Sequence, residues 1–158
     1  MTTQCCHCEE QSDEAISDGL VDPVIIVHSL TQAIAALTAA AAAGRPIVLG
    51  SAPDAAGYVG PAWFSALTTA AGRAVPEARF SALLDCGNNV GAALAAIRAE
   101  VDGIVFTGRH DVAGRLADIA RQHGVRFETS RPLHALDLRD DFFASQETLE
   151  RRCAEFLG

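Results

Sequence analysis

Residues 80–106 read FSALLDCGNNVGAALAAIRAEVDGIVF, and this stretch decides the fold class. Two short apolar runs, 80–84 and 103–106, flank a segment of helical character that Asn88 or Asn89 can cap. Both runs are continuous and do not alternate with polar residues, which is typical of strands buried on both faces of a parallel sheet. We therefore predict a strand–helix–strand unit inside an α/β domain.

The same pattern extends outward in both directions. Apolar runs at 24–27, 46–49 and 125–128 predict three further strands. Right-handed crossovers would bring every strand-to-helix turn to one edge of the sheet. The prediction is a single three-layer α/β domain over residues 23–158, with a five-stranded parallel sheet. We favour a doubly wound sheet in the flavodoxin-like order 2-1-3-4-5, with a half-barrel as the alternative.

Local signals give expected helix boundaries. Ser29 and Gln32 have the spacing of a capping box, and Gly44 can end the helix that follows. Asp111 is the expected cap of a later helix. The last helix is expected over residues 142–156, where apolar side chains recur on one side.

The charge of the chain is unevenly distributed. Of the 158 residues, positions 1–22 hold six acids and no base, whereas the remaining chain has 14 acids against 12 bases. We expect 1–22 to be a disordered acidic tail. Neither part offers the dense basic face that nucleic acid requires, and no apolar run approaches the roughly 20 residues of a membrane span. The N-terminus lacks the features of a signal peptide, so we expect a cytoplasmic protein.

All 12 basic residues are arginine, and the chain has no lysine. Schiff-base aldolases, pyridoxal-phosphate enzymes and Walker-type nucleotide hydrolases each need a lysine amine. These three classes are therefore excluded, and no cofactor is expected.

Three of the five cysteines, Cys5, Cys6 and Cys8, lie close together near the N-terminus. Their spacing suggests a metal site, but a structural zinc site needs four ligands and no second pair exists, so we expect no metal. Residues 6–17 also resemble the translation of a short repeat element found in bacterial genomes. That resemblance implies an accidental extension of the reading frame, and deletion of residues 1–20 should leave fold and activity intact.

A second resemblance concerns the central unit. The segments 82–87, ALLDCG, and 102–109, DGIVFTGR, resemble the closing strand–helix–strand of phosphate-binding (β/α)8 barrels. The resemblance covers about 28 of 158 residues. It implies that Gly87, Asn88, Gly108 and Arg109 face an anion. The whole chain is also similar to small uncharacterised bacterial α/β proteins, which implies no function.

Polar residues follow the predicted strands at the turns where a parallel sheet places its ligands. A long loop, Gly50 to Pro61, follows the second strand; it holds the only Tyr and precedes the only Trp, and we expect it to act as a lid. The candidate residues are His28, Ser29, Ser51, Tyr58, Trp63, Asp85, Cys86, Gly87, Asn88, Thr107, Gly108 and Arg109. Glu128, Arg131 and His134 could complete the same edge.

Within this set, Cys86 is the candidate nucleophile because it precedes a helix N-terminus, which favours a thiolate. His28 would be its base and Asp85 the orienting group, provided that strands one and three are neighbours. The alternative is that Cys86 is a small buried thiol that only packs. Arg109 opposes the local helix dipole, which points to an anionic partner, either a ligand or Asp85.

Two functions remain open from the sequence. In the first, the protein binds a small phosphorylated or carboxylated metabolite at the strand ends, and whether it also transforms this metabolite is left open. In the second, it is a non-catalytic module for interaction or homo-oligomeric assembly, with Trp63 and the C-terminal aromatic residues at the contact. Whether it is an enzyme is left open by the sequence, since a fold does not fix a function.

Overall fold

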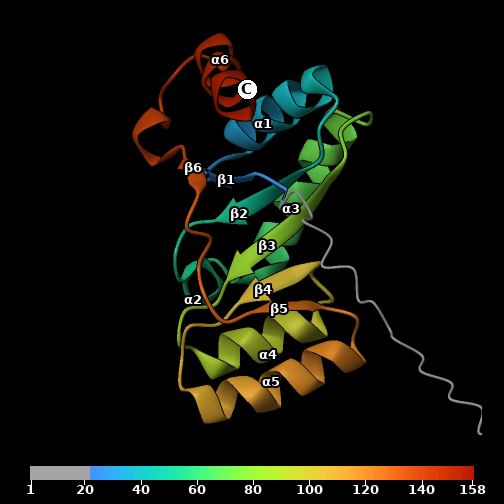
Figure 1. Ribbon diagram of the computed structural model, residues 1–158, viewed down its shortest axis with the longest axis vertical. Helices are drawn as coiled ribbons and strands as arrows, with labels where there is room; N and C mark the ends of the chain where they lie inside the picture. Colours follow the sequence, from blue (N-terminus) through green and yellow to red (C-terminus); the bar gives the residue numbers. More distant parts are fainter. Residues whose placement is uncertain (1–21) are drawn as a thin grey trace, which may run out of the picture.

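The strands of the computed structural model form one parallel sheet in the order β5-β4-β3-β2-β1-β6 (Figure 1). The model describes residues 22–158, so the predictions about the tail, Cys5, Cys6 and Cys8 lie outside the described residues. The strands are β1 (Val24–Val27), β2 (Ile47–Ser51), β3 (Phe80–Asp85), β4 (Gly103–Val105), β5 (Arg126–Glu128) and β6 (Ala135–Asp137).

This order corrects two features of the predicted fold. Strand β2 lies between β1 and β3, so the order 2-1-3-4-5 is wrong, whereas the half-barrel alternative agrees with a sheet whose first five strands lie side by side in chain order. The described part of the chain also has a sixth strand, β6, which pairs with β1. The class, α/β with a parallel sheet, is confirmed.

The helices lie in a row that follows the order of the strands. They are α1 (Leu30–Ala43), α2 (Ala55–Tyr58), α3 (Gly60–Ala74), α4 (Val90–Arg98), α5 (His110–Gln122) and α6 (Gln146–Leu157), with a 3-10 turn η1 (Arg139–Asp141) before α6. In Figure 1, α6 and α1 cover one end of the sheet and α4 and α5 cover the other. Helices α1 and α6 also pack against each other.

Alternate residues of the strands face opposite sides of the sheet. Ile25, Leu49, Leu84 and Ile104 are fully buried in the two clusters formed with the helices. Their neighbours Val24, Val48, Leu83 and Val105 form a third cluster, which contains no helix residue among those described. The domain therefore has two layers of regular structure and not the predicted three, because consecutive right-handed crossovers between adjacent strands place the helices on one face.

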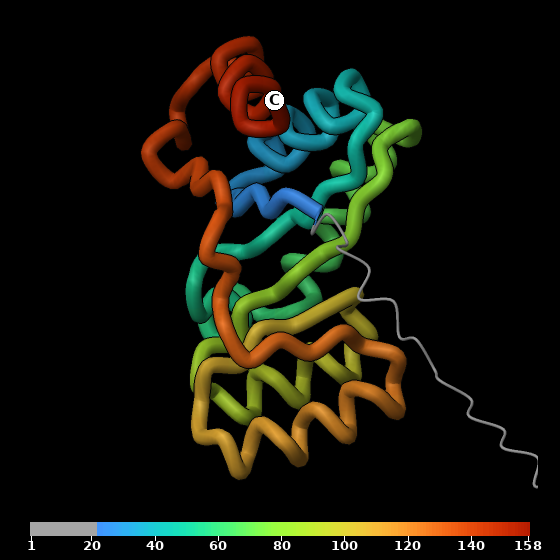
Figure 2. The backbone as a smooth tube through the Cα atoms, in the orientation of Figure 1, coloured from blue at the N-terminus to red at the C-terminus, as the bar shows by residue number. Residues whose placement is uncertain are grey.

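Residues 129–134, here called the strap, connect β5 to β6 across the helix-free face. These two strands lie at opposite edges of the sheet, so the strap must cross it, as the tube in Figure 2 shows. Within the strap, Arg131 precedes Pro132, and a residue before proline is held in an extended conformation. Pro132 lies over Val24 and Leu83 on that face.

Several local predictions are confirmed and others are corrected. The Ser29 Oγ accepts a hydrogen bond from the Gln32 backbone N–H, and Gly44 ends α1 at φ 63°. The Gln32 side chain, however, accepts from the backbone N–H of His28 and donates to the Leu138 carbonyl, so it joins α1 to the chain after β6.

The long loop is shorter than predicted. Strand β2 continues to Ser51, α2 occupies Ala55–Tyr58, and α3 begins at Gly60, so only 52–54 remain irregular before the first helical turn. Asp111 is not the cap of α5 but lies in its first turn, and the last helix begins at Gln146. Within residues 22–158, no helix is both long and apolar enough to cross a bilayer.

Candidate functional site at the carboxyl ends of β2, β3 and β4

Asp85, the last residue of β3, is the centre of a hydrogen-bonded cluster at this edge of the sheet. Its side chain is buried, and its Oδ1 accepts from the backbone N–H groups of Asp54 and Gly87, each at 2.9 Å. Its own backbone N–H donates to the Ser51 Oγ at the end of the neighbouring strand β2. The carboxylate therefore fixes the turns after β2 and β3 against each other.

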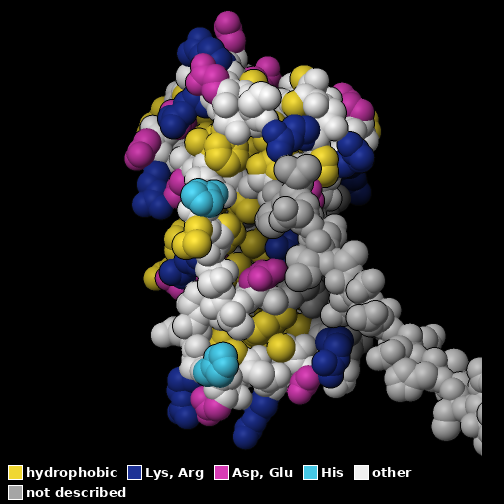
Figure 3. Space-filling model, viewed as in Figure 1, with side chains coloured by type: hydrophobic (Ala, Val, Ile, Leu, Met, Phe, Trp, Pro, Cys, Tyr) yellow, Lys and Arg dark blue, Asp and Glu magenta, His cyan; other side chains and the backbone are white. Residues whose placement is uncertain are grey.

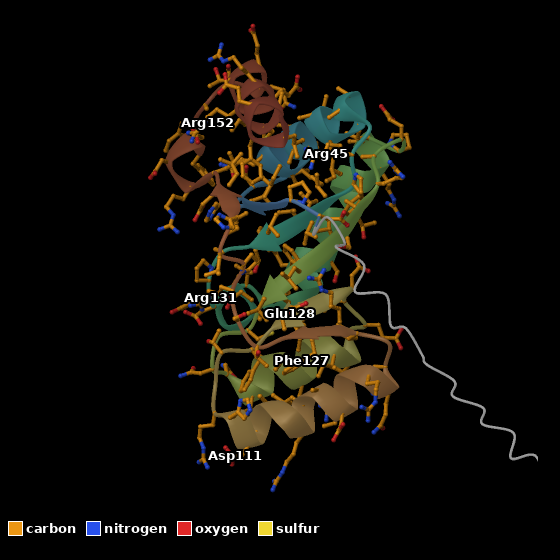
Figure 4. All side chains as sticks on the ribbon, in the orientation of Figure 1. Arg45, Asp111, Phe127, Glu128, Arg131 and Arg152 are labelled. Atoms are coloured by element: carbon orange, nitrogen blue, oxygen red, sulfur yellow. The ribbon has the colours of Figure 1, made fainter. Side chains whose placement is uncertain are left out.

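Arg131 of the strap completes this cluster. Its Nε donates to Asp85 Oδ2 at 2.6 Å and its Nη2 to Asp85 Oδ1 at 3.1 Å. The same Nη2 lies 3.2 Å from Oδ1 of Asp54, and these contacts with Asp85 and Asp54 raise the pKa of Arg131. Figure 4 shows Arg131 on the strap, beside the carboxyl ends of the central strands. The strap is thus fastened to the sheet at a buried acid.

Gly87 allows the turn after β3 to approach Asp54 closely. It has φ 53°, a conformation that L side chains rarely adopt, and a Cβ at this position would lie 1.7 Å from Asp54 Oδ1. Its carbonyl accepts from the Thr107 N–H at 2.8 Å, which joins the turn after β3 to the turn after β4. Glycine is required here by both conformation and space.

Two adjoining clefts open at this edge. The first, of about 530 Å³, is lined by Asp54, Gly57, Tyr58, Cys86, Asn88, Asn89, Thr107 and Arg131. The second, of about 390 Å³, is lined by Asn88, Val90, Phe106, Thr107, Gly108, Arg109 and Val112. They share Asn88 and Thr107, so amide and hydroxyl groups stand between them.

The N-termini of α4 and α5 border these clefts. Asn89 caps α4 by accepting from the Ala92 N–H, and Arg109 is the residue before α5. Within residues 22–158, the backbone N–H groups of Asn88, Gly108 and Arg109 donate to no protein acceptor. Such N–H groups, together with the partial positive charge of a helix N-terminus, are suited to hold an anion.

The structure does not bring His28 to Cys86, because β2 separates β1 from β3. Instead, His28 Nε2 lies 2.7 Å from Oδ1 of Asp137 on β6. Ser29 follows it as the cap of α1, after β1, and β2 lies between β1 and the strand of Asp85. The predicted arrangement of a base on β1 with a nucleophile after β3 is therefore corrected.

Cys86 is 1% exposed and its Sγ lies 3.8 Å from the Leu84 carbonyl. Burial, with a further effect of the nearby Asp85, raises the pKa of this thiol to about 12. The Cys86 thiol is therefore neutral and packed in the core. Nucleophilic catalysis would need the thiolate, which this environment disfavours.

Arg109 does not contact Asp85. Its side chain is 81% exposed and binds Asp111 in the first turn of α5, with Nη2–Oδ2 at 2.9 Å. Trp63, on α3, is exposed and lines neither cleft. Of the twelve candidate residues, those in or directly behind the clefts are Ser51, Tyr58, Asp85, Cys86, Gly87, Asn88, Thr107, Gly108 and Arg109.

Sequence reasoning gave too little weight to Arg131, Asp54 and Asn89. Arg131 was placed at this edge only as one of three residues that could complete it. One signal was available: Asp85, at the end of an apolar strand, is a buried acid, and a buried charge requires a partner.

Within the described residues, no group of three or more His, Cys, Asp or Glu side chains is arranged to hold a metal ion.

Comparisons with known proteins give a fold and no family. No protein-family model matches the chain, and no curated protein matches it. Among solved structures, it is similar to a candidate fructose-1,6-biphosphate aldolase from Coccidioides immitis, with a TM-score of 0.54 and 17% identity. The match covers 67% of this chain and 39% of that protein, so this chain spans less than half of its length. At this identity the likeness shows the fold alone.

Proposed function

We propose that this protein binds a small phosphorylated or carboxylated metabolite at the carboxyl ends of β3 and β4. The observation that carries the proposal is the pair of adjoining clefts, which the N-termini of α4 and α5 border. Asn88 and Thr107 lie where the two clefts meet and would donate to the ligand from both sides. The backbone N–H groups of Gly108 and Arg109 would supply further donors.

The charges around the clefts are compatible with an anion. Asp54 and Asp85 are both bound by Arg131, so their negative charge is partly neutralised. The Arg109 side chain is held only by an exposed ion pair with Asp111, and exposed pairs contribute about 0–1 kcal/mol. Arg109 can therefore leave Asp111 at little cost and turn to a bound anion.

The structural neighbour supports the ligand class without showing it. That protein is described as an aldolase of a sugar bisphosphate, and 67% of the residues of the present chain share the neighbour's fold. An aldolase that forms a Schiff base remains excluded, because this chain has no lysine. The proposal is therefore one of binding, and no reacting group is assigned to Cys86 or His28.

Thermal unfolding in the presence of inorganic phosphate, phosphate esters and carboxylates tests this proposal. A ligand at 100 times its Kd should stabilise the folded protein by about 2.7 kcal/mol if it binds only that state. Arg109→Ala should reduce the stabilisation. Arg121→Ala is the matched control, because Arg121 is an equally exposed arginine of α5 that binds Asp118 and lies at the other end of the helix. If no anion stabilises the protein, or if both variants respond alike, the proposal fails.

A second candidate function, homo-oligomeric assembly, rests on one exposed aromatic pair. Phe142 and Phe143 contact each other edge to face with centroids 5.2 Å apart, and Phe143 is 96% exposed. An exposed aromatic pair of this kind favours a contact with a second copy. Sedimentation velocity should then show a dimer that Phe143→Ser dissociates; a monomer at all concentrations would contradict assembly.

A further inference from the structure

The helix-free face of the sheet carries an apolar hollow beneath the strap, separate from the clefts at the strand ends. A cavity of about 500 Å³ lies between the strap and the sheet, with Val24 and Leu83 on one side and Pro132 and Leu133 on the other, and Phe156 of α6 also lines it. A smaller cavity of about 140 Å³ adjoins it and shares Val24, Leu83, Arg131 and Pro132. Figure 3 shows hydrophobic side chains exposed in the middle of the visible surface.

Two glycines let the side chains on this face of the sheet pack closely around Leu83. Gly50 of β2 pairs with Leu83 of β3, which pairs in turn with Gly103 of β4. A Cβ on Gly50 would lie 3.2 Å from Val24 Cγ1, and one on Gly103 would lie 3.2 Å from Leu83 Cδ1. A larger residue at either position would displace Val24 or Leu83 from the floor of the hollow.

Basic side chains border this apolar floor. Arg126, Arg131 and His134 all line the larger cavity, together with the acids Asp22 and Glu128. Glu128 is bound by Arg126 Nε at 2.7 Å, which leaves both Nη groups of that arginine without a partner among the described residues. The side chains that border the hollow can therefore donate hydrogen bonds to an acidic group of a ligand.

We propose that this hollow binds a small amphipathic carboxylate. Its apolar body would lie on Val24 and Leu83 beneath Pro132, and its carboxylate would accept from the free Nη groups of Arg126. The cavity volume falls in the range typical of small-molecule sites, which are mostly apolar with a few placed polar groups. This ligand is chemically different from the one proposed for the strand ends, and the two sites lie on opposite sides of Arg131.

Methyl-resolved NMR of the full chain titrated with decanoate tests this site within one molecule. Methyl groups of Val24, Leu83 and Val105, on the hollow's side of the sheet, should shift in a saturable manner. Those of Leu49 and Leu84, on the same strands but facing the helices, should shift much less. A titration with inorganic phosphate should leave both sets unchanged, so the failure of one proposed site is distinguishable from the failure of the other.

Two comparisons, one of ligands and one of protein variants, test whether the carboxylate of the ligand contributes to binding. Decanoate should bind at least about tenfold more tightly than decylammonium, because only the carboxylate can accept a charge-assisted hydrogen bond from an arginine. Arg126→Gln should weaken decanoate binding by about tenfold, whereas Arg121→Gln on the outer side of α5 should leave it unchanged. Both arginines are exposed, so neither variant is expected to disturb folding.

Three results would overturn the proposal. The first is the absence of shifts at Val24 and Leu83 at millimolar decanoate. The second is a set of shifts that appears only as protein concentration rises, which would show that a second copy covers the face. The third is contact between these methyl groups and residues 1–21 in the free protein, which would show that the chain's own segment occupies it.

Discussion

Arg131 and Asp85 form a two-point ion pair between the strap and the end of β3, with Nε–Oδ2 at 2.6 Å and Nη2–Oδ1 at 3.1 Å. This pair separates the polar clefts at the strand ends from the apolar hollow on the helix-free face, since Arg131 lines both. The connection from β5 to β6 is held against the sheet there. The pair is therefore the point on which the site and the strap both depend.

Asp85→Asn should destabilise the fold. The uncharged amide loses the charge-assisted bonds from Arg131, and we expect a loss of about 2–3 kcal/mol. This figure lies below that of a fully buried pair because the Arg131 side chain is 42% exposed. Urea denaturation gives the difference. Asp118→Asn, which breaks an exposed pair with Arg121, should change stability by only about 0.5 kcal/mol; equal effects of the two variants would show that the Arg131 contact contributes little.

Gly87→Ala should lower the free energy of unfolding more than the same substitution at another glycine of similar conformation. Gly87 at φ 53° would place a Cβ 1.7 Å from Asp54, whereas Gly124 at φ 69° has nothing within 4 Å of that position. Gly124→Ala should cost about 1 kcal/mol for backbone strain alone, and Gly87→Ala about 2–3 kcal/mol. Denaturation midpoints of the two variants measure the difference. Similar losses would mean that Asp54 moves aside freely.

Cys86 should be unreactive in the folded protein. Because its pKa is raised to about 12, iodoacetamide at pH 8 should label it only after unfolding in urea. Peptide mapping by mass spectrometry distinguishes Cys86 from the other thiols. Stability should fall as pH rises above about 8.5, because the unfolded thiol then ionises while the folded one stays neutral. Rapid labelling of the native protein at Cys86 would restore it as a nucleophile.

Asp137 should make stability depend on acid pH. Burial acts to raise the pKa of its carboxyl, but hydrogen bonds from Arg139 and His28 outweigh burial and lower it. A lowered pKa contributes stability that is present above the ordinary value of about 3.9 and is lost as pH falls through the folded value. The difference in urea midpoint between the wild type and Asp137→Asn should therefore shrink below pH 4. A difference that stays constant with pH would contradict this role.

Local structure was predictable wherever one residue type is physically required. Ser29 and Gly44 marked the two ends of α1 because each satisfies the backbone at a helix terminus. Strand β6 was missed because Ala135, Leu136 and Asp137 form too short a run, with no face fully buried. Its place beside β1 follows from the strap, whose path no local pattern specifies.

The layer arrangement was misjudged for a clear reason. Continuous apolar strands indicate burial on both faces, and Val24, Val48 and Leu83 are indeed buried. Their second face, however, is covered by neighbouring strand side chains and the strap, and not by helices. The same error placed β1 beside β3 and so brought His28 to Cys86. Residues within one turn, such as Asp85, Gly87 and Asn88, were grouped correctly because they lie close together whatever the order of the strands.

Amide shifts of the ¹⁵N-labelled full chain during titration with inorganic phosphate test the central claim most directly. Binding at the ends of β3 and β4 predicts saturable shifts at Asn88, Gly108 and Arg109, whose N–H groups point at no acceptor within the described chain. The N–H groups at the start of α1, beside Ser29, should stay unchanged. Shifts of equal size at both places, or none at Gly108 and Arg109, would contradict an anion site at this edge of the sheet.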